Sequence, residues 1–82
     1  MKVLFFASLR EQLETSVEHW PDLKNCQTVS DVKDLLVKRG EPWSSAISNP
    51  QIIIAVNHEV SSLDTTLSDS DELAFYPPVT GG

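Results

Sequence analysis

The final six residues, Pro77-Pro78-Val79-Thr80-Gly81-Gly82, hold the group best suited to chemistry in this sequence. The α-carboxylate of Gly82 is ionised at neutral pH and its charge repels nucleophiles, so it must become an acyl-adenylate before another atom can attack it. The two prolines stop the preceding strand and give the segment a stiff, extended base. The two glycines lack a Cβ and therefore suit a narrow tunnel in another protein. The alternative interpretation is the frayed terminus in which most chains end.

The other reactive side chains do not form a recognisable motif. His19, Cys26 and His58 are far apart in the sequence and lack the spacing of a zinc site. The sequence has three glycines, two of them at its end, so a phosphate-cradling loop is not expected. We therefore expect no bound cofactor and no metal ion, and we expect a separate protein to activate Gly82.

The single cysteine and the acidic turn are each better explained by structure than by chemistry. Cys26 excludes an intramolecular disulfide, favours a reducing, cytoplasmic location and is expected in a loop or half-buried. Asp69, Asp71 and Glu72 lack the glycine and the distal glutamate of a calcium loop, so we expect a solvated turn there.

The charge of the chain is uneven. The formal net charge is −6, and all Lys and Arg residues lie before residue 40. An acidic second half makes nucleic acid an unfavourable partner, because phosphate contacts need a basic patch. It could steer the chain onto a basic protein surface, or it could simply keep the protein soluble. No apolar run approaches the roughly 20 residues that cross a bilayer, and no signal-peptide cleavage site follows the apolar start, so we expect no membrane association.

Hydrophobic periodicity in the first half predicts two strands and two helices within one domain. Residues 2–6 and 17–20 are expected to be strands, the first with Val3 and Phe5 on one face. A short helix with Leu9 and Leu13 on one face should begin at an N-cap, Ser8. The main helix should begin at Ser30 and end at Gly40. Its apolar stripe is expected to consist of Val32, Leu35 and Leu36.

The second half predicts a loop over residues 41–50 and then three strands. Residues 51–56 should form a central strand, because they are β-branched and apolar on both faces. Asn57-His58 fits a two-residue hairpin turn leading to a strand at residues 59–61. A short helical turn at residues 64–67 and a strand at residues 72–76 complete the order.

This order predicts an α+β roll, a mixed sheet wrapped around one main helix. The first and last strands are expected to pair in parallel. Residues 1–76 would form the domain and residues 77–82 an extended C-terminal tail. Lys2 shares a face with Leu4 and Phe6, so that face should lie outside the core. Phe6 and Tyr76 would then be exposed aromatics near the start of the tail, forming a partner surface unless each packs under a loop.

The end of the sequence closely resembles that of the small, sulfur-carrier subunits of molybdopterin synthase. The resemblance rests first on Phe75-Tyr76-Pro77-Pro78-Val79-Thr80-Gly81-Gly82. It continues in residues 2–7 with Leu9-Arg10-Glu11, in Ala55-Val56-Asn57, and in Leu67-Ser68-Asp69 leading to residues 71–75. It implies a ubiquitin-like β-grasp fold and adds Val60 to the partner surface formed by Phe6 and Tyr76.

The resemblance also implies a mechanism and partners. A ubiquitin-activating-type adenylyltransferase would use ATP to adenylate Gly82, and a persulfide donor would leave Gly82 as a thiocarboxylate. Residues Pro77, Pro78, Val79, Thr80 and Gly81 would insert into the large subunit of molybdopterin synthase, in an expected heterotetramer. There the sulfur would pass to cyclic pyranopterin monophosphate, while the acid/base residues belong to the large subunit. The alternatives are a sulfur carrier for thiamine thiazole synthesis, a ubiquitin-like protein modifier, and an interaction module with an inert tail.

Overall fold

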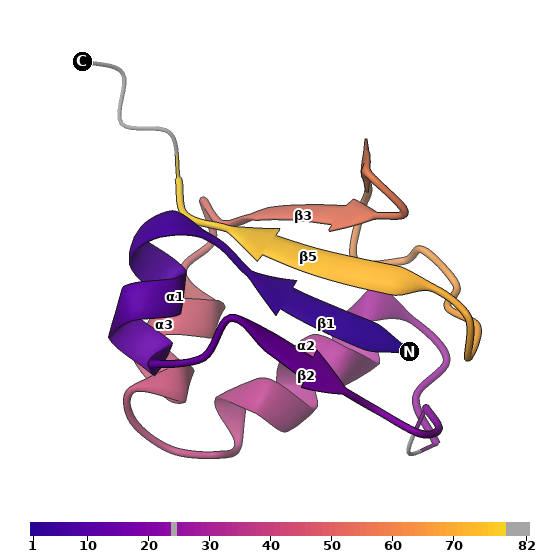
Figure 1. The fold of residues 1–82 in the computed structure, drawn as a ribbon, viewed down its shortest axis with the longest axis horizontal. Helices are drawn as coiled ribbons and strands as arrows, with labels where there is room; N and C mark the ends of the chain where they lie inside the picture. The colour runs from indigo at the N-terminus through magenta and orange to yellow at the C-terminus, as the bar shows by residue number, and fades with distance from the viewer. Residues whose placement is uncertain (24, 79–82) are drawn as a thin grey trace.

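Five strands form one mixed sheet in the computed structural model, which describes residues 1–23 and 25–78 (Figure 1). Along the sheet the order is β2-β1-β5-β3-β4. The first and last strands pair in parallel, and the other neighbours pair antiparallel. The predicted α+β class and the parallel closure are therefore confirmed. The strands are β1 Lys2–Phe5, β2 Val17–His19, β3 Ile53–Val56, β4 Glu59–Val60 and β5 Glu72–Tyr76.

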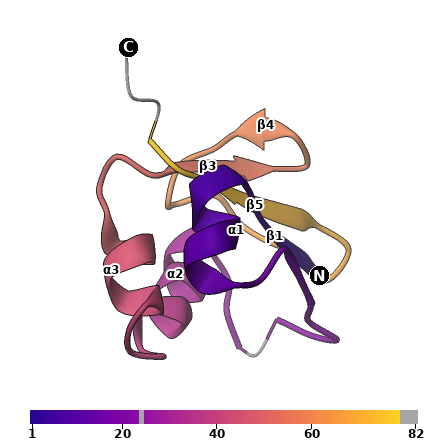
Figure 2. The ribbon, with the colours of Figure 1, turned by 60° about the vertical axis from the view of Figure 1, so that its left-hand side comes forward.

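Three helices gather on one side of this sheet (Figure 2). They are α1 Ala7–Leu13, α2 Val29–Val37 and α3 Trp43–Ser48. Alternate residues of the strands face them and are buried, as period-two patterning predicts. Phe5 and Phe75 are both fully buried and their rings stack with centroids 5.8 Å apart. Burying each such side chain contributes about 2 to 3 kcal/mol, so the pairing of β1 with β5 places two large residues at the centre of the core. The remaining strand residues of the core are Val3, Ile54, Val56 and Leu73.

The start of α1 differs from the prediction. The helix begins after Phe6, which makes no side-chain cap, so the predicted N-cap at Ser8 is wrong. The Phe6 N–H donates to the Phe75 carbonyl (3.1 Å), which extends the pairing of β1 with β5 to the helix boundary. Ala7 then has a φ of 52°, a left-handed conformation that costs roughly 1 kcal/mol for a residue with a Cβ. Leu9 and Leu13 are buried together, as expected.

The main helix α2 begins two residues earlier than predicted. Its N-cap is Thr28, which forms a reciprocal capping box with Asp31, so the predicted N-cap at Ser30 is wrong. Thr28 also bridges Thr66 in antiparallel fashion, and this contact holds it extended before the helix. The early start adds Val29 to the buried stripe, whereas Leu35 is only half-buried.

The end of α2 also differs from the prediction. The C-cap is Lys38, and Gly40 follows it with a φ of 86°. Gly40 therefore occupies the left-handed turn beyond the helix and is not its C-cap.

Three expectations for the second half are also corrected. Residues 41–50 contain helix α3, whose signal was the spacing of Trp43, Ala46 and Ile47. Residues 64–67 are not helical, because Thr66 pairs with Thr28 in an extended bridge. β3 begins at Ile53, two residues later than predicted, and lies between β5 and β4 inside the sheet, as a central strand should. The hairpin turn at Asn57-His58 is confirmed, with φ values of 51° and 71°.

Candidate functional site

The face of the sheet turned away from the helices carries an ordered pattern of side chains, and we call it the open face. Because neighbouring strands are in register, residues on this face fall into rows that cross the sheet. One row crosses all five strands and is entirely apolar. It follows the pairs Leu4↔Val17, Leu4↔Ala74, Ala55↔Ala74 and Ala55↔Val60.

The row nearest the end of β5 is aromatic and aliphatic. Tyr76 pairs with Ile53 across β5 and β3. The rings of Phe6 and Tyr76 stack almost parallel, with centroids 4.6 Å apart and planes 5° apart. Both aromatics lie near the start of the tail, but each is half-buried by this stack and is not fully exposed as predicted.

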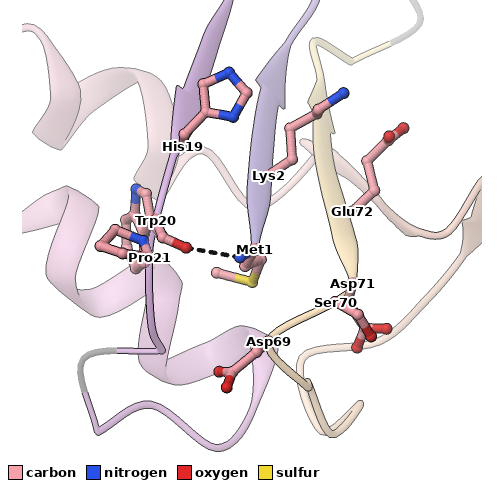
Figure 3. Close-up of a pocket in the computed structure, with 9 residues that line it drawn as sticks. All are labelled: Met1, Lys2, His19, Trp20, Pro21, Asp69, Ser70, Asp71 and Glu72. Atoms are coloured by element: carbon pink, nitrogen blue, oxygen red, sulfur yellow. Dashed lines mark hydrogen bonds between the residues drawn. The ribbon is translucent and has the colours of Figure 1, made fainter.

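The row at the other end of the open face is charged. Lys2 pairs with His19 on one side and with Glu72 on the other. His58, in the hairpin turn, places its Nε2 3.5 Å from Glu72 Oε1. In Figure 3 the side chains of His19, Lys2 and Glu72 rise side by side from β2, β1 and β5. The apolar rows are therefore bounded by charge at one end and by the start of the tail at the other.

A groove of about 580 Å³ lies on the open face beside the start of the tail. Ala55 belongs to the floor of the groove, which the sheet forms. Val60 lies at the side of the groove and is 80% exposed, more than any other large hydrophobic residue among those described. The groove residues are Ala7, Ile53, Ala55, His58, Val60, Tyr76, Pro77 and Pro78. A mainly apolar groove of this kind is suited to binding another protein, and its only acid/base groups among the described residues are the His58 imidazole and the Tyr76 phenol.

The predicted site residues are thus partly brought together. Tyr76, Val60, Pro77 and Pro78 line one groove, and Phe6 stacks on the first of them. Val79, Thr80, Gly81 and Gly82 lie outside the described residues. Ala7, Ile53, Ala55 and His58 also line the groove and were not predicted. Ile53 and Ala55 are placed there by the pairing of β3 with β4 and β5, and their alternation along residues 53–55 was the available signal.

A second hollow, of about 720 Å³, lies at the charged end of the sheet (Figure 3). Several of its polar groups have hydrogen-bond partners within the chain. The Met1 ammonium donates to the Trp20 carbonyl at 2.7 Å. Asp71 accepts from Asn57 Nδ2 at 2.9 Å and from the Ser68 N–H at 2.8 Å. These two hydrogen bonds, led by that from Asn57, lower the pKa of Asp71 below its ordinary value of 3.8.

The other groups considered from the sequence do not assemble into a site. Within residues 1–23 and 25–78, no cluster of three His, Cys, Asp or Glu side chains is arranged to hold a metal ion. Cys26 lies in the loop before α2 and is buried, an environment in which thiols are generally inert. In the same part of the chain, none of the helices has the length and hydropathy needed to cross a membrane.

Comparisons with known proteins agree with this fold. The model of the ThiS family matches residues 3–82. The molybdopterin synthase sulfur carrier subunit of Escherichia coli (strain K12) is 37% identical over 82 residues, covering 100% of this chain and 99% of that protein. The equivalent subunit of Haemophilus influenzae is 33% identical with the same coverage. The crystal structure of SAMP1 from Haloferax volcanii superposes with a TM-score of 0.72 at 29% identity, covering 100% of this chain and 98% of that one.

Proposed function

This chain belongs to the ThiS family, together with the molybdopterin synthase sulfur carrier subunits, and from that membership we propose that it carries sulfur on Gly82 for molybdopterin synthase. The match to the family continues to the last glycine, and the relatives are covered over 99% of their length. Residues 1–76 act in this proposal as a rigid body, and residues 77–82 as the tail that it presents. The chain itself binds no cofactor and catalyses no step.

The proposed chemistry proceeds at the α-carboxylate of Gly82. In a ubiquitin-activating-type adenylyltransferase, a carboxylate oxygen attacks the α-phosphorus of ATP and pyrophosphate leaves, which gives an acyl-adenylate. The terminal sulfur of a persulfide donor then attacks the carbonyl carbon and AMP leaves. A thiol reductant cleaves the resulting S–S bond, so that Gly82 becomes a thiocarboxylate and the donor and reductant sulfurs form a disulfide. We place these steps in the cytoplasm, where thiols stay reduced.

The second half of the proposal is sulfur transfer in the large subunit. The tail enters the active site of that subunit, where the thiocarboxylate sulfur bonds to a carbon of cyclic pyranopterin monophosphate and displaces an oxygen substituent. Water then cleaves the bond between this sulfur and the Gly82 carbonyl carbon, which leaves the sulfur on the pterin and returns Gly82 to a carboxylate. Two such transfers make the dithiolene of molybdopterin. The acid/base residues are supplied by the large subunit, with which the chain is expected to form a heterotetramer.

The position of the groove is the structural observation that carries the proposal. Pro77 and Pro78 line it, and the four residues after Pro78 can span at most about 14 Å. Any protein that reacts with Gly82 must therefore bring its reacting groups within about 14 Å of Pro78, beside this part of the open face. The apolar surface there, with Phe6, Val60 and Tyr76, is suited to being covered.

Intact-mass spectrometry tests the function directly. The chain is incubated with the adenylyltransferase, ATP, a persulfide donor and a thiol reductant. We expect the mass to rise by the difference between one sulfur and one oxygen, and we expect no change in a variant that lacks Gly82. An unchanged mass of the native chain under conditions that load a known carrier would contradict the proposal.

Protein modification is the second candidate, because the superposed SAMP1 belongs to the small archaeal modifier proteins. In that case the activated Gly82 carbonyl would be attacked by a lysine amine and AMP would leave, forming an isopeptide bond. Conjugates of the chain with other proteins, detected by a Gly-Gly remnant on lysine after proteolysis, would favour this alternative. Sulfur loading without conjugates would favour the carrier.

A further inference from the structure

The last residue of β5 is held from two sides. Tyr76 pairs with Ile53 of β3 in the register of the sheet. On its other side β1 has already ended, because the last pair between β1 and β5 is Phe5↔Phe75. The ring of Phe6 lies where a further strand pair would be and stacks on the Tyr76 ring, with centroids 4.6 Å apart. The stack therefore restrains the residue from which the tail starts.

Phe6 is itself fixed through its backbone. Its N–H donates to the Phe75 carbonyl at 3.1 Å, and its carbonyl accepts from the Leu9 N–H at 3.1 Å. Phe6 is extended, with a φ of −118° and a ψ of 156°, and Ala7 directly after it has a φ of 52°. This left-handed turn is unfavourable for a residue with a Cβ, but it lets α1 leave the sheet while Phe6 keeps the strand direction. The chain thus tolerates backbone strain next to the ring that stacks on Tyr76.

The backbone after Tyr76 transmits this restraint into the tail. A proline fixes its own φ at about −65° and biases the residue before it towards extended conformations. Pro77 and Pro78 therefore stiffen the backbone from Tyr76 to Pro78, and both prolines are half-buried beside the groove. The direction of this stiff segment consequently depends on the orientation of Tyr76.

We propose that Phe6 is a positioning residue for the reactions of Gly82, because its stack on Tyr76 fixes the direction in which the tail leaves the sheet. The inference rests on the proposed function, in which Gly82 must reach the reacting groups of another protein. An error in direction at Tyr76 is carried to Gly82 over the four residues after Pro78, which span at most about 14 Å. A fixed direction raises the fraction of bound complexes in which Gly82 lies at the reacting groups. This role is intramolecular and is separate from any contact between Phe6 and a partner.

The two roles of Phe6 predict different kinetics. A contact with a partner lowers the concentration of chain needed for half-saturation, whereas positioning of the tail increases the rate constant at saturation. Adenylation of Gly82 is the reaction to measure, because it precedes both sulfur loading and isopeptide formation. Pyrophosphate release is followed in single turnovers with ATP and with the adenylyltransferase in excess.

Three sets of variants separate the stack from the contact. Phe6→Leu keeps an apolar side chain but removes the ring, and Phe6→Tyr is the matched control that keeps the ring. Replacing Pro77 and Pro78 together by alanine loosens the segment after Tyr76 without removing the stack. Thermal unfolding checks that each variant is folded.

We expect Phe6→Leu to lower the rate constant at saturation by about 5-fold or more and to raise the half-saturation concentration by less than about 2-fold. Phe6→Tyr should stay within about 2-fold of the native rate constant. When both prolines are alanine, Phe6→Leu should change the rate constant by less than about 2-fold, because the stack no longer directs Gly82. An effect of Phe6→Leu confined to the half-saturation concentration would overturn the inference, as would an equal loss of rate with and without the prolines.

The isolated chain gives a second test that does not depend on the proposed function. Carbon-13 relaxation measures the order of the Pro77 and Pro78 Cα atoms on the picosecond-to-nanosecond timescale. We expect Phe6→Leu to lower their order parameters and Phe6→Tyr to leave them unchanged, and unchanged order in Phe6→Leu would overturn the inference.

The two tests together separate this inference from the proposed function. Adenylation of the native chain that Phe6→Leu does not slow would contradict the inference alone. Lower order in Phe6→Leu, together with a native chain that the adenylyltransferase does not activate, would contradict the proposed function and support the inference.

Discussion

The two ends of the open sheet face offer a direct comparison. The charged end holds the larger hollow, about 720 Å³, and the tail end holds a groove of about 580 Å³. At the charged end, several polar groups already have partners in the chain, such as Asp71 with Asn57 and the Met1 ammonium with Trp20. At the tail end, the walls are mainly apolar side chains in contact with water.

The difference shows that the size of a hollow does not identify a docking site in this protein. Covering a polar hollow adds little to the binding free energy when its polar groups already form hydrogen bonds within the chain. Such groups lose their contacts with water and form no new hydrogen bonds with the partner. When a partner covers an apolar groove, the binding free energy becomes more favourable in proportion to the apolar area removed from water. Only the tail end also lies within reach of Gly82, so we expect changes there to alter function and changes at the charged end to alter stability.

The largest expected effect comes from removing Gly82. Sulfur loading should be abolished, because the reacting carbonyl is lost, while the free energy of unfolding should be unchanged, because no core residue is touched. Intact mass and thermal unfolding measure the two quantities. A loss of folding on deletion would break the separation between the tail and the body.

The next effect comes from the aromatic stack. Tyr76→Ala removes one of two rings that stack at 4.6 Å beside the groove and should weaken binding to the large subunit about 10-fold. Phe6→Ala should act in the same direction. Each should reduce affinity more than it reduces the free energy of unfolding, because both rings are only half-buried. His19→Ala at the charged end is the control, and a comparable loss of affinity in that variant would remove the distinction between the two ends.

A smaller effect is expected at the charged end, in the dependence of stability on pH. The pKa of Asp71 is lowered in the folded chain by its hydrogen bonds to Asn57 and Ser68, so the folded state favours the carboxylate. The contribution of the Asp71 carboxylate to the free energy of unfolding is fully present above the pKa of Asp71 in the unfolded chain, near 3.8. It is lost as the pH falls below that value. Because Asp71 is near the surface, the contribution should be under about 1 kcal/mol. Asp71→Asn should flatten this part of the profile in urea unfolding between pH 6 and pH 2, and an unchanged slope would contradict the assignment.

The smallest effect is expected for Lys2→Gln. Lys2 lies in the charged row beyond the apolar rows, where a rim charge changes association rates and salt dependence more than affinity. Affinity for the large subunit should change less than about 2-fold at physiological salt. A 10-fold change would show that the docking surface extends to the charged end.

The success of prediction varied with the range of the interactions involved. Strands β1 and β5, the turn at Asn57-His58 and the buried pair Leu9 and Leu13 follow from alternation, positive φ tolerance and helical spacing, which are local. The start of α2 at Thr28 was missed, because Thr28 is held by a bridge to Thr66, far along the chain. Helix α3 was missed for a different reason, since its six residues, Trp43–Ser48, carry only a short apolar pattern directly after Pro42.

The sequence by itself determined the diglycine end, the stiff prolines before it, the class of fold and the aromatics Phe6 and Tyr76. These depend on residue chemistry and on periods of two or 3.6 residues, which are readable without knowing neighbours in space. Only the tertiary structure decided that Ala55 and Ala74 pair across β3 and β5, with Val60 and Ile53 as neighbours on the same face. It also decided that His58 lies close to Glu72. Those contacts come from the register between strands that are distant in sequence, and register is set by the packing of the whole sheet on its helices.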